Sequence, residues 1–202
     1  MCSTDIVCLS SRFGQAIMLG VTTMDCRPYL GLLYLIAFIA VLSAVTVSPM
    51  LIEPGSAVNL DGRVGRMDHA VLWSGMGILP GSIYSMGDYL CHQMGDRSLW
   101  INGSQLPICI REYVLLIGAT VGAAICFWIP SFIDGNTKRA TLFALAMVMI
   151  SPAEWAVSEF CGYDPGMEVI SAVSILSGVG FAILIHCIMA MSFHRATRRA
   201  VY

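Results

Sequence analysis

The chain has 202 residues, of which 57% are hydrophobic and 12% charged, and its mean hydropathy is +0.76. Soluble domains carry about a quarter charged residues, so this composition excludes an ordinary water-soluble domain and favours a small multi-pass membrane protein. With 11 basic and 13 acidic residues the net charge is −2, which leaves no basic surface for nucleic acid. We therefore expect an all-α integral membrane helical bundle whose main partner is the lipid bilayer.

The N-terminal region contains a leader and a first membrane span. A span needs about 20 apolar residues, because the helix rise sets its length. Residues 29–52 satisfy this without a charge and end at Glu53-Pro54-Gly55, so we interpret 1–28 as a cytoplasmic leader and 29–202 as a single membrane domain. A cleaved signal peptide is the alternative, but its apolar region is typically only about 7 to 15 residues long.

A long outer loop, residues 53–112, follows the first span. Within it, residues 69–90 are apolar but are interrupted by His69, Pro80, Asp88 and glycines. This pattern predicts an interfacial or re-entrant segment, with a fifth span as the alternative. A fifth span would place the N-terminus on the opposite side of the membrane.

Three further spans are expected at about 113–132, 140–160 and 169–192, giving four in all. The third contains Pro152 and Glu154, so we expect it to continue as a bent helix. In the second span, Gly118 and Gly122 form a G-x-x-x-G pattern that allows close approach of another helix. That helix could belong to the same bundle, to a second copy in a homo-oligomer, or to another partner in a membrane complex.

Lys and Arg near the spans predict the orientation, because they concentrate on the cytoplasmic side. With four spans, one side receives a basic set, whereas the loop at 161–168 contains neither Lys nor Arg. The basic set comprises Arg12, Arg27, Lys138, Arg139, Arg195, Arg198 and Arg199. We expect a protein of the cell membrane with both termini in the cytoplasm.

The cysteines that this topology brings to the outer face are candidate ligands. Cys91, His92 and Cys109 belong to the outer loop, and Cys161 ends the third span. Three thiolates and an imidazole match the ligands of a tetrahedral zinc-like site, although adjacent Cys91 and His92 rarely bind one ion without a bend. A Cys91–Cys109 disulfide is the second interpretation, and unreactive buried thiols are the third.

The residues around these cysteines form an ordered set of short motifs. They read Cys91-His92-Gln93, then Arg97-Ser98, then Pro107-Ile108-Cys109-Ile110-Arg111 opening a span with Gly118 and Gly122. This set resembles the signature of domain-of-unknown-function family 2085, small multi-pass membrane proteins of archaea and bacteria. The resemblance implies that Gln93, Arg97 and Ser98 have functional or structural roles, but it implies no activity.

The chain departs from the family pattern in the third span. There the family carries Asp-Gly-x-x-Gln after a proline, whereas this chain has Pro152-Ala153-Glu154-Trp155. Either Glu154 replaces the family aspartate or this part of the site is missing.

Charged residues at the span ends have two interpretations, because lipid penalises charges that are neither paired nor hydrated. They could form a ring of interfacial ion pairs. Alternatively, Arg111 pairs with Glu154 or Glu159 across two helices and lines an outer polar pocket with Cys91, His92 and Cys109.

The chain contains no G-x-S-x-G, H-E-x-x-H, Walker or dinucleotide-binding motif, so we do not expect an enzyme. The first functional hypothesis is a membrane protein whose outer Cys/His/Arg cluster is structural, metal-binding or redox-active. The alternative is a small transporter, or an accessory subunit of a membrane complex, with a charge-lined solute path.

Overall fold

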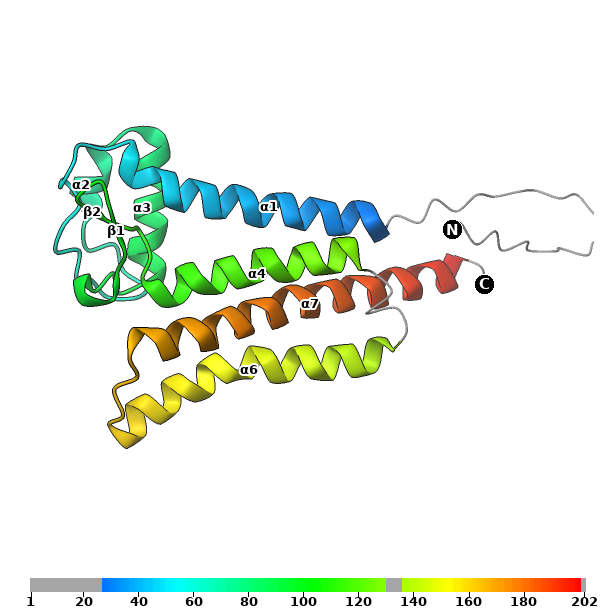
Figure 1. Ribbon diagram of the computed structural model, residues 1–202. Coiled ribbons are helices and arrows are strands. Elements are labelled where there is room, and N and C mark those ends of the chain that lie inside the picture. Colours follow the sequence, from blue (N-terminus) through cyan, green and yellow to red (C-terminus); the bar gives the residue numbers. More distant parts are fainter. Residues whose placement is uncertain (1–26, 130–135, 201–202) are drawn as a thin grey trace, which may run out of the picture.

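The computed structural model describes residues 27–129 and 136–200, so nearly all of the expected leader lies outside the described residues. Four long helices lie alongside one another (Figure 1). They are α1 (Arg27–Val47), α4 (Ile110–Trp128), α6 (Thr137–Cys161) and α7 (Met167–Ala200).

Each long helix is apolar enough to cross a bilayer. The candidate spans are Gly31–Met50, Ile110–Trp128, Thr137–Cys161 and Met167–Ser192, with hydropathies of 2.3, 1.6, 1.6 and 2.2. At about 1.5 Å of rise per residue, helices of this length reach across the apolar core of a bilayer. The expected all-α membrane bundle with four spans is therefore confirmed.

Glycines allow α4 and α7 to pack closely. A Cβ atom at Gly118 would lie 2.3 Å from the Ile175 carbonyl oxygen, and one at Gly178 would lie 2.1 Å from that of Leu115. Only backbones without side chains at these points can approach so closely. The G-x-x-x-G pattern is therefore used within the bundle.

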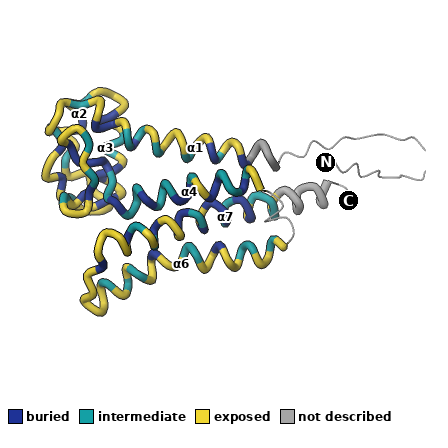
Figure 2. The backbone as a smooth tube through the Cα atoms, in the orientation of Figure 1, coloured by how far each residue is buried: buried dark blue, intermediate teal, exposed yellow. Residues whose placement is uncertain are grey.

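The second neighbour of α7 is α6. Ser177 donates a hydrogen bond from its hydroxyl to the Val148 carbonyl oxygen at 2.7 Å, which joins the two helices. The rest of α6 is mostly exposed, as Figure 2 shows, and only 11% of its apolar window is buried. In a bilayer this surface faces lipid. As the sequence predicted, α6 continues through Pro152.

Between α1 and α4 the chain forms a compact head, defined as residues 51–109. The turn η1 (Ser48–Met50) leads from α1 into it. Its elements are α2 (Ala70–Ser74), α3 (Ile78–Leu90), the turn η2 (Gly95–Arg97), β1 (Trp100–Ile101) and β2 (Ser104–Gln105). The strands pair antiparallel through Asn102 and Gly103, whose positive φ values of 54° and 69° suit a tight hairpin turn.

The head has its own small core of Ala57, Leu60, Trp73 and Tyr84. The rings of Trp73 and Tyr84 stack with centroids 5.0 Å apart. The predicted apolar segment 69–90 forms α2 and α3 rather than one long helix. With 13 residues, α3 is about 20 Å long, which is too short to cross the roughly 30 Å bilayer core.

Candidate functional site

Two cysteines and a glutamate converge where the head meets the bundle. Cys91 directly follows α3, Cys109 directly precedes α4, and Glu112 lies in the first turn of α4. Their potential ligand atoms all lie within 4.8 Å of one another. We call Cys91, Cys109 and Glu112 the thiol–carboxylate cluster.

Backbone amides surround the sulfur of Cys91. The Cys109 amide donates to Cys91 Sγ at 3.2 Å, and the Gln93 amide donates to it at 3.5 Å. Gln93 adopts a positive φ of 50°, which turns the chain back over the sulfur. Amides pointing at a sulfur stabilise its thiolate form, which is the form that binds metals and acts as a nucleophile.

Glu112 completes the cluster from the side of α4. Its Oε2 atom accepts a hydrogen bond from Cys91 Sγ at 3.5 Å and a second, shorter one from Cys109 Sγ. Cys91 is buried, and the other two side chains are partly buried. Both thiols are free rather than joined in a disulfide.

The two thiols differ in their tendency to ionise. The hydrogen bond from the Cys109 thiol lowers the pKa of Cys91, outweighing burial and the Glu112 charge. The same hydrogen bond raises the pKa of Cys109, and burial and the Glu112 charge raise it further. Of the two thiols, Cys91 therefore loses its proton more readily than Cys109.

A network of buried amides fixes the backbone on both sides of the cluster. Gln93 Nε2 donates to the Pro107 carbonyl oxygen at 2.6 Å, and Gln105 Nε2 donates to the Gln93 carbonyl oxygen at 3.1 Å. Gly87 lies against this same stretch, since a Cβ there would be 1.9 Å from the Pro107 oxygen. The packing of α3 against Pro107, just before α4, therefore fixes the positions of Cys91 and Cys109.

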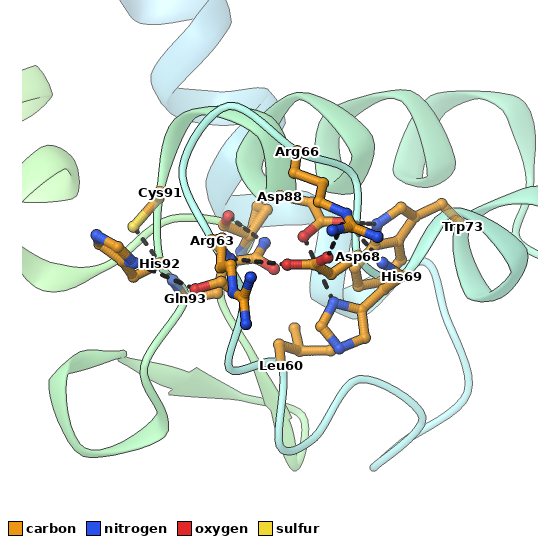
Figure 3. Close-up of polar contacts among 12 residues, drawn as sticks. Leu60, Arg63, Arg66, Asp68, His69, Trp73, Asp88, Cys91, His92 and Gln93 are labelled. Atoms are coloured by element: carbon orange, nitrogen blue, oxygen red, sulfur yellow. Dashed lines mark hydrogen bonds and ion pairs between the residues drawn. The ribbon is translucent and has the colours of Figure 1, made fainter.

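A second polar centre lies deeper in the head, around the fully buried Asp88 (Figure 3). Its carboxylate accepts hydrogen bonds from the Trp73 indole at 2.8 Å and the His69 amide at 2.9 Å. The His69 ring lies 3.4 Å away. Although burial raises the pKa of Asp88, these contacts outweigh it and leave that pKa below its usual value.

The other ligands expected from the sequence lie apart from the thiol–carboxylate cluster. His92 is exposed, and its Nδ1 atom lies 3.1 Å from the Gly62 carbonyl oxygen. Cys91 has extended backbone angles, φ −134° and ψ 150°, and successive side chains of an extended chain point in opposite directions. Cys161 is exposed at the end of α6.

The remaining expected residues divide between structural and exposed positions. Gln93 and Ser98 are buried, and the Ser98 hydroxyl donates to the Met94 carbonyl oxygen at 2.8 Å. Arg97 lies 3.9 Å from Asp164 in an exposed ion pair. Glu159 is exposed on α6.

Arg111 and Glu154 form the ion pair that the sequence suggested. Arg111 Nη2 lies 3.1 Å from Glu154 Oε2, and the side chains are 20% and 11% exposed. Glu154 Oε1 is buried without a hydrogen-bond partner. The pair connects the first turn of α4 with the second half of α6, and a polar pocket beside it remains a prediction.

Sequence reasoning missed Glu112 as a member of the cluster. Its signal was its place three residues after Cys109, the N-cap of α4. An N-cap residue and a glutamate three positions later lie next to each other in the first helical turn. That spacing brings a carboxylate to Cys109 without any metal-binding motif in the sequence.

Comparison with protein families agrees with the motifs. Residues 91–188 match the family described as "Predicted membrane protein (DUF2085)", and the matching segment contains the cluster, Arg111 and Glu154. No curated protein and no solved structure matches the chain. The match covers just under half of the chain, from Cys91 to the last span, and supports the assignment of residues 91–188 to the DUF2085 family of membrane proteins.

Proposed function

We propose that this membrane protein binds one zinc-like divalent metal ion at the thiol–carboxylate cluster. The observation that carries the proposal is the convergence of two sulfur atoms and a carboxylate oxygen within 4.8 Å of one another. Cysteine thiolates and carboxylates are both common zinc ligands. Three protein ligands leave a fourth position for water or another donor.

The electrostatics of the cluster support a cation. The Glu112 charge opposes ionisation of both thiols, so the fully ionised cluster would hold three anionic groups that repel one another. A divalent ion among them removes that repulsion and deprotonates the thiols. The nearest basic side chain along the chain, Arg111, is instead 3.1 Å from Glu154.

The sequence-derived candidates His92 and Cys161 stay proposals for the fourth ligand. His92 is the stronger candidate because it follows Cys91 directly, but its ring would have to leave Gly62. Water fills the fourth position if neither side chain moves.

Metal analysis of the purified protein in detergent tests this proposal. We expect about one zinc ion per chain in the wild type and near-background content in Cys91→Ser, Cys109→Ser and Glu112→Gln, because each removes a ligand. Cys161→Ser is the matched control: it removes an exposed cysteine outside the cluster and should retain the metal.

Thiol counting on the same samples separates the metal from the disulfide. Background metal in the wild type, together with loss of both thiols of Cys91 and Cys109, would replace the metal proposal with a disulfide. Background metal with both thiols free would leave the third interpretation, unreactive thiols.

We also propose that the protein lies in the cell membrane with both termini, including the leader, in the cytoplasm. The N-terminal end of α1 and the C-terminal end of α7 lie at the same end of the bundle, and the head lies at the other (Figure 1). Lys138 and Arg139, at the start of α6, belong to the end that holds the termini. Basic residues gather on the cytoplasmic side of membrane proteins.

A further inference from the structure

In α3 the charged side chain is buried and the large apolar side chains are exposed, which is the reverse of a helix in a water-soluble domain. Its only charged residue, Asp88, is fully buried, together with Tyr84 and the small residues on the same side. Its exposed face is almost entirely apolar. The exposed large side chains are Ile78 at 92%, Leu79 at 54%, Met86 at 51%, Tyr89 at 50% and Leu90 at 53%.

The apolar residues of this face form one continuous stripe. Leu79, Ile83, Met86 and Leu90 recur at intervals of three and four residues, which aligns them along one side of a helix. In α2, which packs on α3, Val71 is also 88% exposed. Clustered apolar exposure of this kind marks a surface that contacts lipid or another protein.

The position of α3 puts this face at the membrane boundary. Its buried side packs on η1, and η1 forms the last residues of the first candidate span. Gly87 fits against Pro107, which precedes Cys109 by two residues and the first residue of the second span, Ile110, by three. Figure 1 shows α3 lying across the ends of the spans instead of running parallel to them.

We propose that α3 is an interfacial helix whose exposed face is seated in the boundary between lipid headgroups and acyl chains. Helices with a strongly apolar face lie in this layer, buried about 5 to 10 Å into it. We assign this face to the bilayer, and not to another protein, because α3 contacts the end of a span that is itself in lipid. Tyr89 fits the same layer, where aromatic side chains with a polar tip are enriched.

The interfacial seat also explains why the charge of α3 is buried. A carboxylate on the outer face would be in contact with acyl chains, where an unpaired charge is costly. At Asp88 the carboxylate is enclosed by Trp73 and His69 instead.

Photo-crosslinking of the full-length protein tests the proposal. Benzoylphenylalanine is introduced at Leu79 or Met86, and the purified variants are reconstituted in vesicles of phosphatidylethanolamine and phosphatidylglycerol. Asp61 and Asp96 serve as control positions, since both are exposed in the head outside α3. After illumination, mass spectrometry identifies what each position has captured.

We expect lipid adducts at Leu79 and Met86 in severalfold higher yield than at Asp61 and Asp96. Lipid yields at Leu79 and Met86 equal to those of the controls would overturn the proposal, because the face would then be in water. Covalent dimers at these positions would also overturn it and assign the face to a second copy of the chain.

Discussion

At the scale of single residues, Asp88 is the charge most completely removed from solvent among the described residues, with no exposed surface. A buried carboxylate is costly unless hydrogen bonds replace its water. Trp73 and His69 supply those bonds and lower the pKa of Asp88 against the effect of burial. Asp88 therefore connects α2 and α3, and it does so more strongly when it is ionised.

We expect acid to weaken the head through this residue. An unperturbed aspartate has a pKa of about 3.9, and the pKa of Asp88 in the folded protein is lower. The stabilisation is therefore complete above the unfolded-state pKa and is lost as pH falls through the folded-state pKa.

Asp88→Asn tests this expectation by thermal unfolding in detergent, followed by circular dichroism between pH 7 and pH 3. It should cost about 1 to 3 kcal/mol at pH 7, because an amide replaces the hydrogen-bonded charge. Its melting temperature should fall less with acid than that of the wild type. Asp96→Asn, at an exposed position, should match the wild type in both respects. Equal acid sensitivity of Asp88→Asn and wild type would contradict the assignment.

Only part of the thiol–carboxylate cluster could be predicted from the sequence. Cys91 and Cys109 could be predicted to meet, because the four-span topology brings their segments to the same face. The side on which His92 lies depends on the backbone angles at Cys91, and the sequence does not state these. Glu112 was overlooked because its contact with Cys109 arises from the helical start of α4.

At the scale of elements, the Arg111–Glu154 pair joins two helices that α7 otherwise connects. The strong packing in the bundle is between α4 and α7 and between α6 and α7. With side chains 20% and 11% exposed, the pair is largely shielded from water. Loss of one partner leaves an uncompensated charge at the membrane boundary.

A double-mutant cycle measures this pair. Arg111→Met and Glu154→Gln should each destabilise the bundle by about 2 to 4 kcal/mol, and the double variant should be more stable than the worse single variant. Melting temperatures in detergent report the effect. The exposed pair Arg97–Asp164, at 3.9 Å, is the control and should show coupling near zero. A double variant destabilised by the sum of the two single effects would show that the two side chains do not interact, and the charge-lined solute path suggested from the sequence would lose its support.

The long helices were predictable and the head was not, for physical reasons. A span is defined by the absence of charge over about 20 residues, which composition alone reveals. Expected and observed spans differ mainly at their ends, as for 113–132 against Ile110–Trp128. The position of α3 depends instead on contacts with Trp73 and Pro107, which are distant in sequence. These contacts bury the charged Asp88 and leave large apolar side chains of α3 exposed.

At the scale of the whole molecule, the proposed orientation places one exposed cysteine outside the cell. Cys161 is the last residue of α6, and this end of α6 lies at the end of the bundle opposite the termini (Figure 1). The span cysteines Cys126 and Cys187 are buried. Cys161 is therefore a reporter of the outer face.

A membrane-impermeant maleimide should label wild-type protein in intact cells, and Cys161→Ser should lose most of that labelling. A protease-sensitive tag at the C-terminus should be cleaved only after the cells are permeabilised. Cleavage of the tag in intact cells, with labelling unaffected by Cys161→Ser, would reverse the orientation.

The close fit of α7 against α4 also has a consequence for how the bundle is made. Gly118 and Gly178, on opposite sides of that contact, are 60 positions apart, and α7 is synthesised after α1, α4 and α6. Until α7 has entered the bilayer, the glycine face of α4 is not packed against α7, and α6 lacks the helix with which it makes most of its contacts. Packing of the bundle thus requires α7, and a chain cut short before Met167 would leave α4 and α6 without their main packing partner, exposing surfaces that cellular quality control can recognise.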